Sequence, residues 1–535
     1  MLNTTRSTRA MAVAPHHLAS QSALAVMRDG GNAIEAMIAA AATIAVVYPH
    51  MNGIGGDGFW LIVPPEGAPI GAPIAIDASG PAAQAATISL YRDKGMKTIP
   101  MRGPLAANTV AGTVGGWQAA LEVSREQGGA LPLARLLQDA IGYARGGVAV
   151  TVSQQNATKS KWLQLRGQPG FADQFTIDGA LPLAGQRFMQ PRIAATLEAL
   201  VRDGLDSFYR GPLAARIGAD LAAAGSPVTA ADLADYRARR VTPLHLAHSR
   251  GDLYNLTPPT QGAVSLAILG LLDRAGLEQV APDSADHIHL VVEATKLAFG
   301  LRDEFLTDPG HMALAGQDLL DGARLDALAA RIDAQRAAPW GAGKGPGDTI
   351  WMGAIDDSGL AVSFIQSIYH EFGSGVVLGD TGINWQNRGA SFSLDEHALL
   401  ALKPGKQPFH TLNPAAARLK DGRTMVYGTM GGDGQPQTQA AVFTRHVLFG
   451  QPLQQAVTAP RWLLGRTWGQ STDSLKLEAR WPAAVVDELR RRGHDVELLG
   501  EFDENMGHAG AIVRQADGIL EGACDPRSDG AVASW

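Results

Sequence analysis

The chain has 535 residues, 46% of them apolar, so it can bury a large core without disulfides or a structural metal. The net charge is −7 and no run of basic residues occurs, so we expect no nucleic-acid partner. A single cysteine, Cys524, excludes an intramolecular disulfide and multi-cysteine metal sites, which leaves the chemistry to oxygen and nitrogen groups.

The N-terminal part of the chain predicts helices and no targeting segment. Residues 1–20 lack the uninterrupted apolar run of a secretory signal, so we expect a cytoplasmic location. Alanine-rich sequence predicts a helix over residues 20–48, interrupted at Gly30-Gly31 and restarted with Asn32 as its cap. The most apolar stretch, residues 33–48, is too short to span a bilayer and contains Glu35, so no membrane role is expected.

A glycine-rich loop comes next. Gly53-x-Gly55-x-x-Gly58 has the spacing of a dinucleotide fingerprint, but the apolar run Phe59–Val63 after it predicts a buried strand. The fingerprint needs the opposite order, because the helix that follows its glycines binds the pyrophosphate. We therefore expect no nucleotide at this loop.

Residues 131–320 have mostly helical periodicity, with the clearest helices at residues 230–238 and 286–302. His289 and Glu293 lie four residues apart on the second helix, and with His287 they would be a start for a metal site. Neither an HExxH motif nor a second ligand cluster accompanies them. We interpret these histidines as structural and expect neither a metal nor another cofactor.

Residues 336–348 are rich in Gly, Ala and Pro and predict a surface linker, and residues 349–355 and 359–368 then predict a hairpin. Thr349 begins this hairpin. A threonine hydroxyl needs a base within reach, and cleavage after Asp348 would give Thr349 a free α-amino group with a pKa of about 7.7 to 8.0. On this segment alone, the alternative that Thr349 only starts a strand stays open.

Several motifs together resemble one known family. They are Gly30-Gly31-Asn32-Ala33 with Gly53-Ile54-Gly55-Gly56, His289 to Lys296, Asp348-Thr349 with Phe372-Gly373-Ser374-Gly375, Gly428-Thr429-Met430-Gly431-Gly432, and Asp525-Pro526-Arg527. This set is similar to the γ-glutamyltransferase family of N-terminal nucleophile hydrolases, whose members are made as one precursor that cuts itself into a large and a small subunit. The resemblance covers most of the chain.

The resemblance implies an α+β fold, a four-layer αββα sandwich, in which subunits of residues 1–348 and 349–535 form one body. Thr349 would be the nucleophile, released by self-cleavage after Asp348. The backbone N–H groups of Gly431 and Gly432 would hold the oxyanion, and Ser367 would orient the nucleophile. Association of the processed heterodimer into a homo-oligomer is a further expectation.

The sequence departs from the family where glutamyl donors bind. The arginine that holds the donor carboxylate is missing near Ile88, the aspartate for the donor amino group is replaced by Ser391, and two serines are replaced by His410 and Thr411. Loss of both ionic partners argues against a γ-glutamyl donor.

Residues 386–389 and Arg102 resemble the branch of the family that contains oxamate amidohydrolase and cephalosporin acylase-like members. The expected reaction is therefore hydrolysis of a small carboxylate-bearing amide such as oxamate. Arg388 or Arg102 would supply the counter-charge, with Ser391, His410 and Thr411 in the substrate site.

Two alternatives remain. The first is a glutathione hydrolase or γ-glutamyltransferase with altered donor contacts. The second is an uncut, non-catalytic binding protein on the same fold, because Trp351 and Gly353 replace a histidine and a serine of the family.

Overall fold

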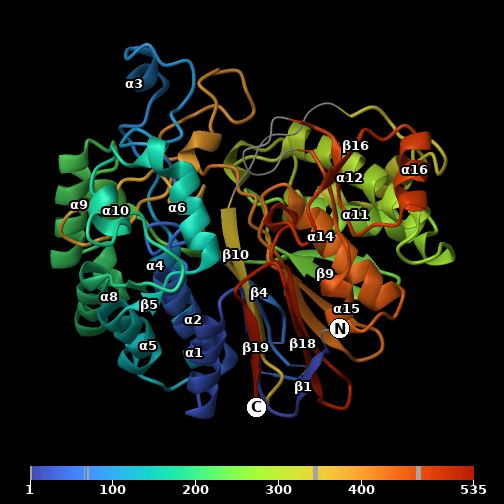
Figure 1. The fold of residues 1–535 in the computed structure, drawn as a ribbon, viewed down its shortest axis with the longest axis horizontal. Helices are drawn as coiled ribbons and strands as arrows, with labels where there is room; N and C mark the ends of the chain where they lie inside the picture. The colour runs from blue at the N-terminus through green and yellow to red at the C-terminus, as the bar shows by residue number, and fades with distance from the viewer. Residues whose placement is uncertain (1–2, 66, 69–70, 341–347, 466–471) are drawn as a thin grey trace.

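Two seven-stranded sheets lie face to face between layers of helices (Figure 1). The structure, a computed structural model, describes residues 3–65, 67–68, 71–340, 348–465 and 472–535. Every strand pair within the two sheets is antiparallel. The predicted four-layer αββα sandwich is confirmed.

The first sheet contains the predicted hairpin. Its strands, in order, are β19 (Ala531–Ser534), β2 (Met11–Ala14), β10 (Asp348–Ile355), β11 (Ala361–Tyr369), β3 (Asp57–Val63), β4 (Ile74–Ala78) and β7 (Arg239–Val241). β10 and β11 are thus inserted between β2 and β3, and strands from both sides of residue 348 share the sheet. Separation of residues 1–348 from residues 349–535 would therefore break this sheet at its centre.

The second sheet carries the loop of the candidate oxyanion site. Its order is β1 (Thr5–Ser7), β18 (Leu520–Cys524), β17 (Gly510–Arg514), β13 (Thr424–Gly428), β12 (Ala415–Leu419), β9 (Gly251–Asn255) and β8 (Leu244–His248). Smaller sheets are formed by β14 (Trp462–Leu464), β15 (Leu475–Glu478) and β16 (Val496–Leu499), and by β5 (Val148–Ala149) and β6 (Arg187–Phe188).

Helices cover the outer face of each sheet. The first sheet is covered by α1 (His17–Arg28), α2 (Ala33–Val47) and α4 (Thr113–Glu126), and the second by α11 (Gly262–Arg274), α14 (Gly434–Phe443) and α15 (Leu453–Thr458). The remaining α-helices are α3 (Ile88–Arg92), α5 (Leu133–Gly146), α6 (Val152–Leu165), α7 (Phe171–Phe175), α8 (Pro191–Asp203), α9 (Pro212–Ala224), α10 (Ala230–Asp235), α12 (Ala285–Phe305), α13 (Gly322–Ala329) and α16 (Ala483–Arg491).

The predicted interruption between the first two helices is confirmed, together with its cap. The Asn32 side chain accepts from the backbone N–H groups of Ile34 and Glu35, while the Glu35 carboxylate accepts from Asn32 N. This reciprocal capping box satisfies N–H groups that the helix leaves unpaired. Every residue of α2 is buried, as its apolar composition predicts.

Two helix boundaries differ from prediction. α10 ends at Asp235 instead of residue 238, because Tyr236 adopts an extended backbone and packs its ring 5.1 Å from that of Tyr209. α12 extends to Phe305, beyond the predicted end at residue 302. Local propensity specifies the exact end of a helix poorly.

The glycines of the loop at residues 53–58 are required by close backbone approach. A Cβ on Gly55 would lie 2.2 Å from the Asn384 carbonyl oxygen, and one on Gly56 would lie 2.1 Å from that of Ser367. This loop joins α2 to β3 and packs against the end of β11, so its glycines have a structural role.

Trp351 and Gly353, the two departures next to Thr349, are explained by packing. Trp351 is buried between the sheets, and its indole N–H donates to Ser363 Oγ at 2.9 Å. A Cβ on Gly353, Gly428 or Gly510 would lie within 2.8 Å of the Trp351 ring. Three glycines therefore make room for one large ring, and the replacements belong to the inter-sheet core.

Part of the predicted linker, residues 341–347, lies outside the described residues. Residues 336–340 form no helix or strand, as predicted. Among the helices that the structure describes, none combines the length and apolarity needed to cross a membrane.

Candidate active site

Thr349 lies at an irregularity in the pairing of β10 with β11. Asp348 pairs with Tyr369, whereas Ile350 pairs with Gln366, so Thr349 faces both Ser367 and Ile368 across a β-bulge. Bulges re-aim side chains and recur beside active sites. Thr349 is fully buried, and Gln435 Nε2 of α14 donates to its hydroxyl oxygen at 3.4 Å.

Ser367, predicted to orient the nucleophile, lies opposite this bulge. Its hydroxyl accepts from the backbone N–H of Tyr369 at 2.8 Å, which fixes the side chain beside the strand end. Across the sheet, Ser367 also pairs with Asp57 of β3. The structure therefore brings Ser367, Thr349 and the start of β3 together.

Gly431 and Gly432 form the turn between β13 and α14. Their φ angles are +116° and +52°, which favour glycine. Their carbonyl oxygens accept from Gly434 N and Gln435 N, while neither glycine N–H donates to another described residue. Two N–H donors at the positive end of α14 are thus available to an anion. This arrangement suits the predicted oxyanion role.

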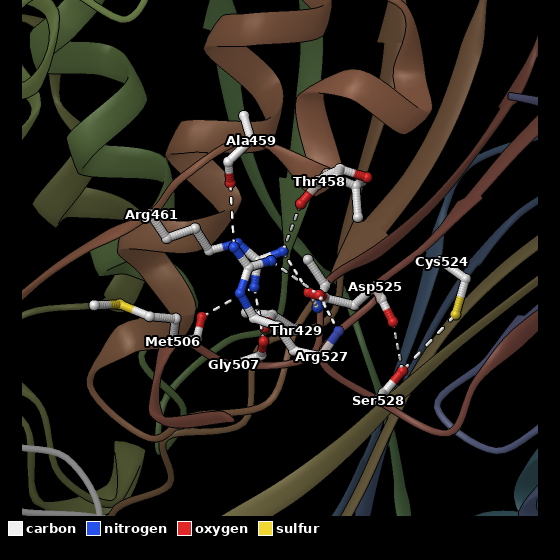
Figure 2. Close-up of polar contacts among 12 residues, drawn as sticks. Thr429, Thr458, Ala459, Arg461, Met506, Gly507, Cys524, Asp525, Arg527 and Ser528 are labelled. Carbon is white, nitrogen blue, oxygen red and sulfur yellow. Dashed lines mark hydrogen bonds and ion pairs between the residues drawn. The ribbon is translucent and has the colours of Figure 1, made fainter. Parts of the chain in front are cut away.

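The C-terminal motif Asp525–Arg527 belongs to a cluster of polar contacts with Arg461 (Figure 2). Arg461 is ion-paired with Asp525 and donates through Nη1 to the carbonyl oxygens of Met506 (3.0 Å) and Gly507 (2.7 Å). A Cβ on Gly507 would lie 2.5 Å from the Met430 carbonyl oxygen, so this backbone directly supports the turn.

Arg527 completes the buried network. It contacts Asp525 at 3.0 Å and Glu478 at 2.6 Å, and all three side chains are fully buried. The arginines hold the pKa of Asp525 below its usual value against the opposing effect of burial. The motif therefore has a structural role, as a rigid base under the candidate oxyanion turn.

Arg388, one of the predicted substrate-binding residues, is 1% exposed and stacks over Tyr369, with its guanidinium carbon 3.9 Å from the ring centroid. Nε donates to the Phe409 carbonyl oxygen at 2.8 Å, and Nη1 has no hydrogen-bond partner among the described residues. Burial lowers the Arg388 pKa to about 10, so the group stays cationic at neutral pH. Because Tyr369 pairs with Asp348, this cation lies beside the start of the nucleophile segment.

His410 faces a carboxylate that the sequence did not predict. Asp57 Oδ2 lies 3.1 Å from His410 Nε2, while Oδ1 accepts from Gly80 N, Gly112 N and Gln386 Nε2. Burial raises the Asp57 pKa to about 8 and, with Arg388 nearby, lowers the His410 pKa well below its usual value. At neutral pH these shifts favour a protonated, neutral Asp57 beside a neutral His410, and neither Oδ2 nor Nε2 has hydrogen-bond geometry to a described residue. An acidic residue within a glycine loop is the only sequence signal for Asp57.

The other predicted substrate residues have different surroundings. Thr411 is buried and its hydroxyl has no partner among the described residues, whereas Ser391 Oγ donates to the Arg388 carbonyl oxygen at 3.0 Å. Arg102 Nη1 donates to the Glu371 carbonyl oxygen at 2.6 Å, and Nη2 lies 3.8 Å from the Glu371 carboxylate. Arg102 thus braces the loop after β11, which leaves Arg388 as the better anion ligand.

Comparison with known proteins finds similar sequences and a similar fold over nearly the whole chain. The family described as Gamma-glutamyltranspeptidase matches residues 19–535. The oxamate amidohydrolase proenzyme of Klebsiella pneumoniae subsp. pneumoniae is 65% identical over 99% of both chains, and the glutathione hydrolase-like YwrD proenzyme of Bacillus subtilis is 40% identical over 98% of both. A crystal structure of cephalosporin acylase from Bacillus halodurans superposes with a TM-score of 0.90 at 33% identity, covering 100% of this chain and 97% of that one. The sandwich is therefore of the N-terminal nucleophile hydrolase type.

Proposed function

This chain belongs to the gamma-glutamyltranspeptidase family and is an enzyme, and we propose that it is a self-processing amidohydrolase acting on a small carboxylate-bearing amide such as oxamate. The observation that carries the proposal is the buried Arg388 cation beside β10, whose Nη1 has no hydrogen-bond partner in the described part of the chain. Similarity to a protein named oxamate amidohydrolase proenzyme supports the substrate class.

Self-cleavage would begin with attack of Thr349 Oγ on the Asp348 carbonyl carbon. The C–N bond to Thr349 breaks as the proton moves from oxygen to nitrogen, which leaves an ester and a free α-amino group. Water then hydrolyses the ester to give the Asp348 carboxylate and a free Thr349 hydroxyl. Nucleophile and base are now parts of one residue.

In turnover, the Thr349 hydroxyl would attack the substrate amide carbon and pass its proton to the α-amino group. Gly431 and Gly432 would donate to the oxyanion, a contribution of about 3 to 4 kcal/mol per donor in comparable sites. The leaving ammonia takes the proton back as the C–N bond breaks. Water, deprotonated by the same amine, then releases the acid and regenerates Thr349.

The substrate carboxylate would lie against Arg388, with Thr411 as an additional donor and the Asp57–His410 pair as the neighbouring wall. Charge-assisted bonds to a buried guanidinium are among the stronger ones available to a protein. Ser391 would act by holding the Arg388 backbone. Arg102 would contribute through the loop after β11.

The proposal is tested by two measurements on the purified protein. Denaturing electrophoresis with mass spectrometry should show two fragments divided between Asp348 and Thr349, and a single uncut band would instead favour the non-catalytic alternative. Initial rates should be highest for oxamate among oxamate, a glutaryl amide and a γ-glutamyl anilide. Preference for the γ-glutamyl donor by orders of magnitude would establish the glutathione hydrolase alternative.

A further inference from the structure

Five polar side chains outside the candidate active site converge on the chain around the start of the predicted linker. We call residues 333–340, which form no helix or strand, the stem. The side chains around it, called the clamp, are His289, Glu293 and Lys296 of α12 and, after α16, Arg492 and His494. The clamp therefore draws on sequence from both sides of residue 348.

One turn of α12 holds both backbone groups of Ala338. Glu293 Oε2 accepts from Ala338 N at 3.0 Å, and Lys296 Nζ donates to the Ala338 carbonyl oxygen at 2.6 Å. Lys296 also contacts Glu293 Oε1 at 2.7 Å. The charged pair is thus neutralised while both of its members contact the stem.

The start of the stem is held by a histidine pair. His289 Nε2 must donate to the Asp333 carbonyl oxygen at 2.8 Å, because a carbonyl only accepts. Nδ1 of the neutral ring is then an acceptor and receives His494 Nε2–H at 2.8 Å. Burial lowers the pKa of both histidines, which agrees with two neutral rings.

Arg492 and Trp340 hold the rest of the stem in place. Arg492 Nη1 donates to the Ala334 carbonyl oxygen at 3.1 Å, and the Arg492 carbonyl oxygen accepts from Ala337 N at 2.8 Å. Trp340 packs its ring 5.7 Å from that of Phe299 on α12. Contacts thus fix the stem from Asp333 to its last residue.

The stem does not need the clamp to satisfy its backbone hydrogen-bonding groups. Ala338 and most other stem residues are exposed, so water would satisfy their backbone groups at little cost. His289, Glu293, Arg492 and His494 are each less than 9% exposed. Burial of charged groups against an exposed coil therefore indicates a positional role.

A metal site is the competing interpretation, because the ligand atoms of His289, Glu293 and His494 lie within 4.8 Å of one another. Two histidines and one carboxylate are a zinc-type ligand set. Lys296, however, already supplies the positive charge at Glu293, and His289 Nδ1 already accepts the hydrogen bond from His494 Nε2. The hydrogen-bonded clamp explains every one of these contacts without an ion.

We propose that the clamp positions the stem so that the linker presents the Asp348–Thr349 bond for self-cleavage. Thr349 is buried in β10 and the Trp340 ring packs against Phe299 of α12, so the described chain is held on both sides of the linker. Anchors at both ends reduce the conformations open to the scissile peptide. The clamp residues are positioning residues, and the inference rests on the self-cleavage proposed above.

The test measures maturation separately from turnover. The double variant Glu293→Leu/Lys296→Met removes both charges together, so no buried charge is left unpaired. Arg492→Met removes the hydrogen bond to Ala334. Arg491→Met is its matched control, since Arg491 also pairs with Glu488 but makes no hydrogen bond to the stem among the described residues. Chains are pulse-labelled in cell-free synthesis, and conversion of precursor to fragments is followed on denaturing gels.

We expect the double variant to mature about tenfold more slowly than wild type, Arg492→Met to be slowed in the same direction, and Arg491→Met to be unaffected. Once matured, all should have kcat/KM within about twofold of wild type. Maturation of both clamp variants at the wild-type rate, equal slowing of the control, or parallel loss of kcat/KM would overturn the inference.

Metal analysis of the purified protein distinguishes the hydrogen-bonded clamp from a metal site. One zinc per chain, with maturation that stops on EDTA treatment and resumes with zinc, would replace the clamp by a metal site. A wild-type chain that stays uncut, or is cut at another bond, would instead refute the proposed function and is seen before any variant is made.

Discussion

Arg388→Met is the sharpest test of the proposed substrate class. Methionine has a similar length and can keep the contact with Tyr369, but it removes the only fully buried guanidinium that the structure describes beside β10 and β11. If a carboxylate binds there, the variant loses its counter-charge. If Arg388 only braces the Phe409 carbonyl, every substrate should be affected alike.

The magnitude follows from the burial of this cation. Two opposite charges about 4 Å apart interact by about 4 kcal/mol at an effective dielectric constant of about 20. Part of this is lost in desolvating the substrate, so we take about 3 kcal/mol, which is a little over a hundredfold in kcat/KM. Asp57, left without the cation, is expected to become more fully protonated, which limits structural damage.

The assay compares oxamate with oxamide, in which a neutral carboxamide replaces the carboxylate. Release of ammonia is measured for wild type and variant with both substrates, so that effects common to the two cancel in the cycle. We expect Arg388→Met to lose about a hundredfold on oxamate and less than about threefold on oxamide. Arg102→Met, whose wild-type side chain contacts Glu371, is the control and should not change the ratio of the two. Equal losses on both substrates would show that Arg388 does not bind the carboxylate.

Three further changes test the other parts of the site. Thr349→Ala should leave one uncut band on a denaturing gel, and two fragments with wild-type turnover would disprove the nucleophile. Gly431→Ala should lower kcat by roughly 10² to 10³ with little change in KM, because φ at +116° is strained for alanine and the N–H must move; unchanged kcat would exclude this donor. Asp57→Asn should gain thermal stability relative to wild type as pH rises from about 4 to 8, since folded Asp57 keeps a proton that the unfolded chain releases; a difference in Tm that is constant with pH would contradict the raised pKa.

Local interactions explain why several secondary-structure elements were predictable from the sequence. The Asn32 cap, the apolar run at residues 59–63 and the hairpin after Thr349 depend on neighbours a few residues away, and the structure confirms all three. The nucleophile and the turn at Gly431 and Gly432 were assigned by resemblance. Their roles remain proposals, although the two available N–H donors agree with them.

Other features depend on groups distant in sequence. Asp57 becomes a candidate site residue only because its carboxylate meets His410, more than 300 residues away, and Trp351 is accommodated only because Gly428 and Gly510 approach it from the second sheet. Arg388 and Arg102 look equivalent in the sequence, and their different acceptors distinguish them. Side-chain identity fixes which hydrogen bonds a group is able to donate or accept. Its charge state and its unsatisfied donors and acceptors depend on burial and long-range partners, which only the folded chain determines.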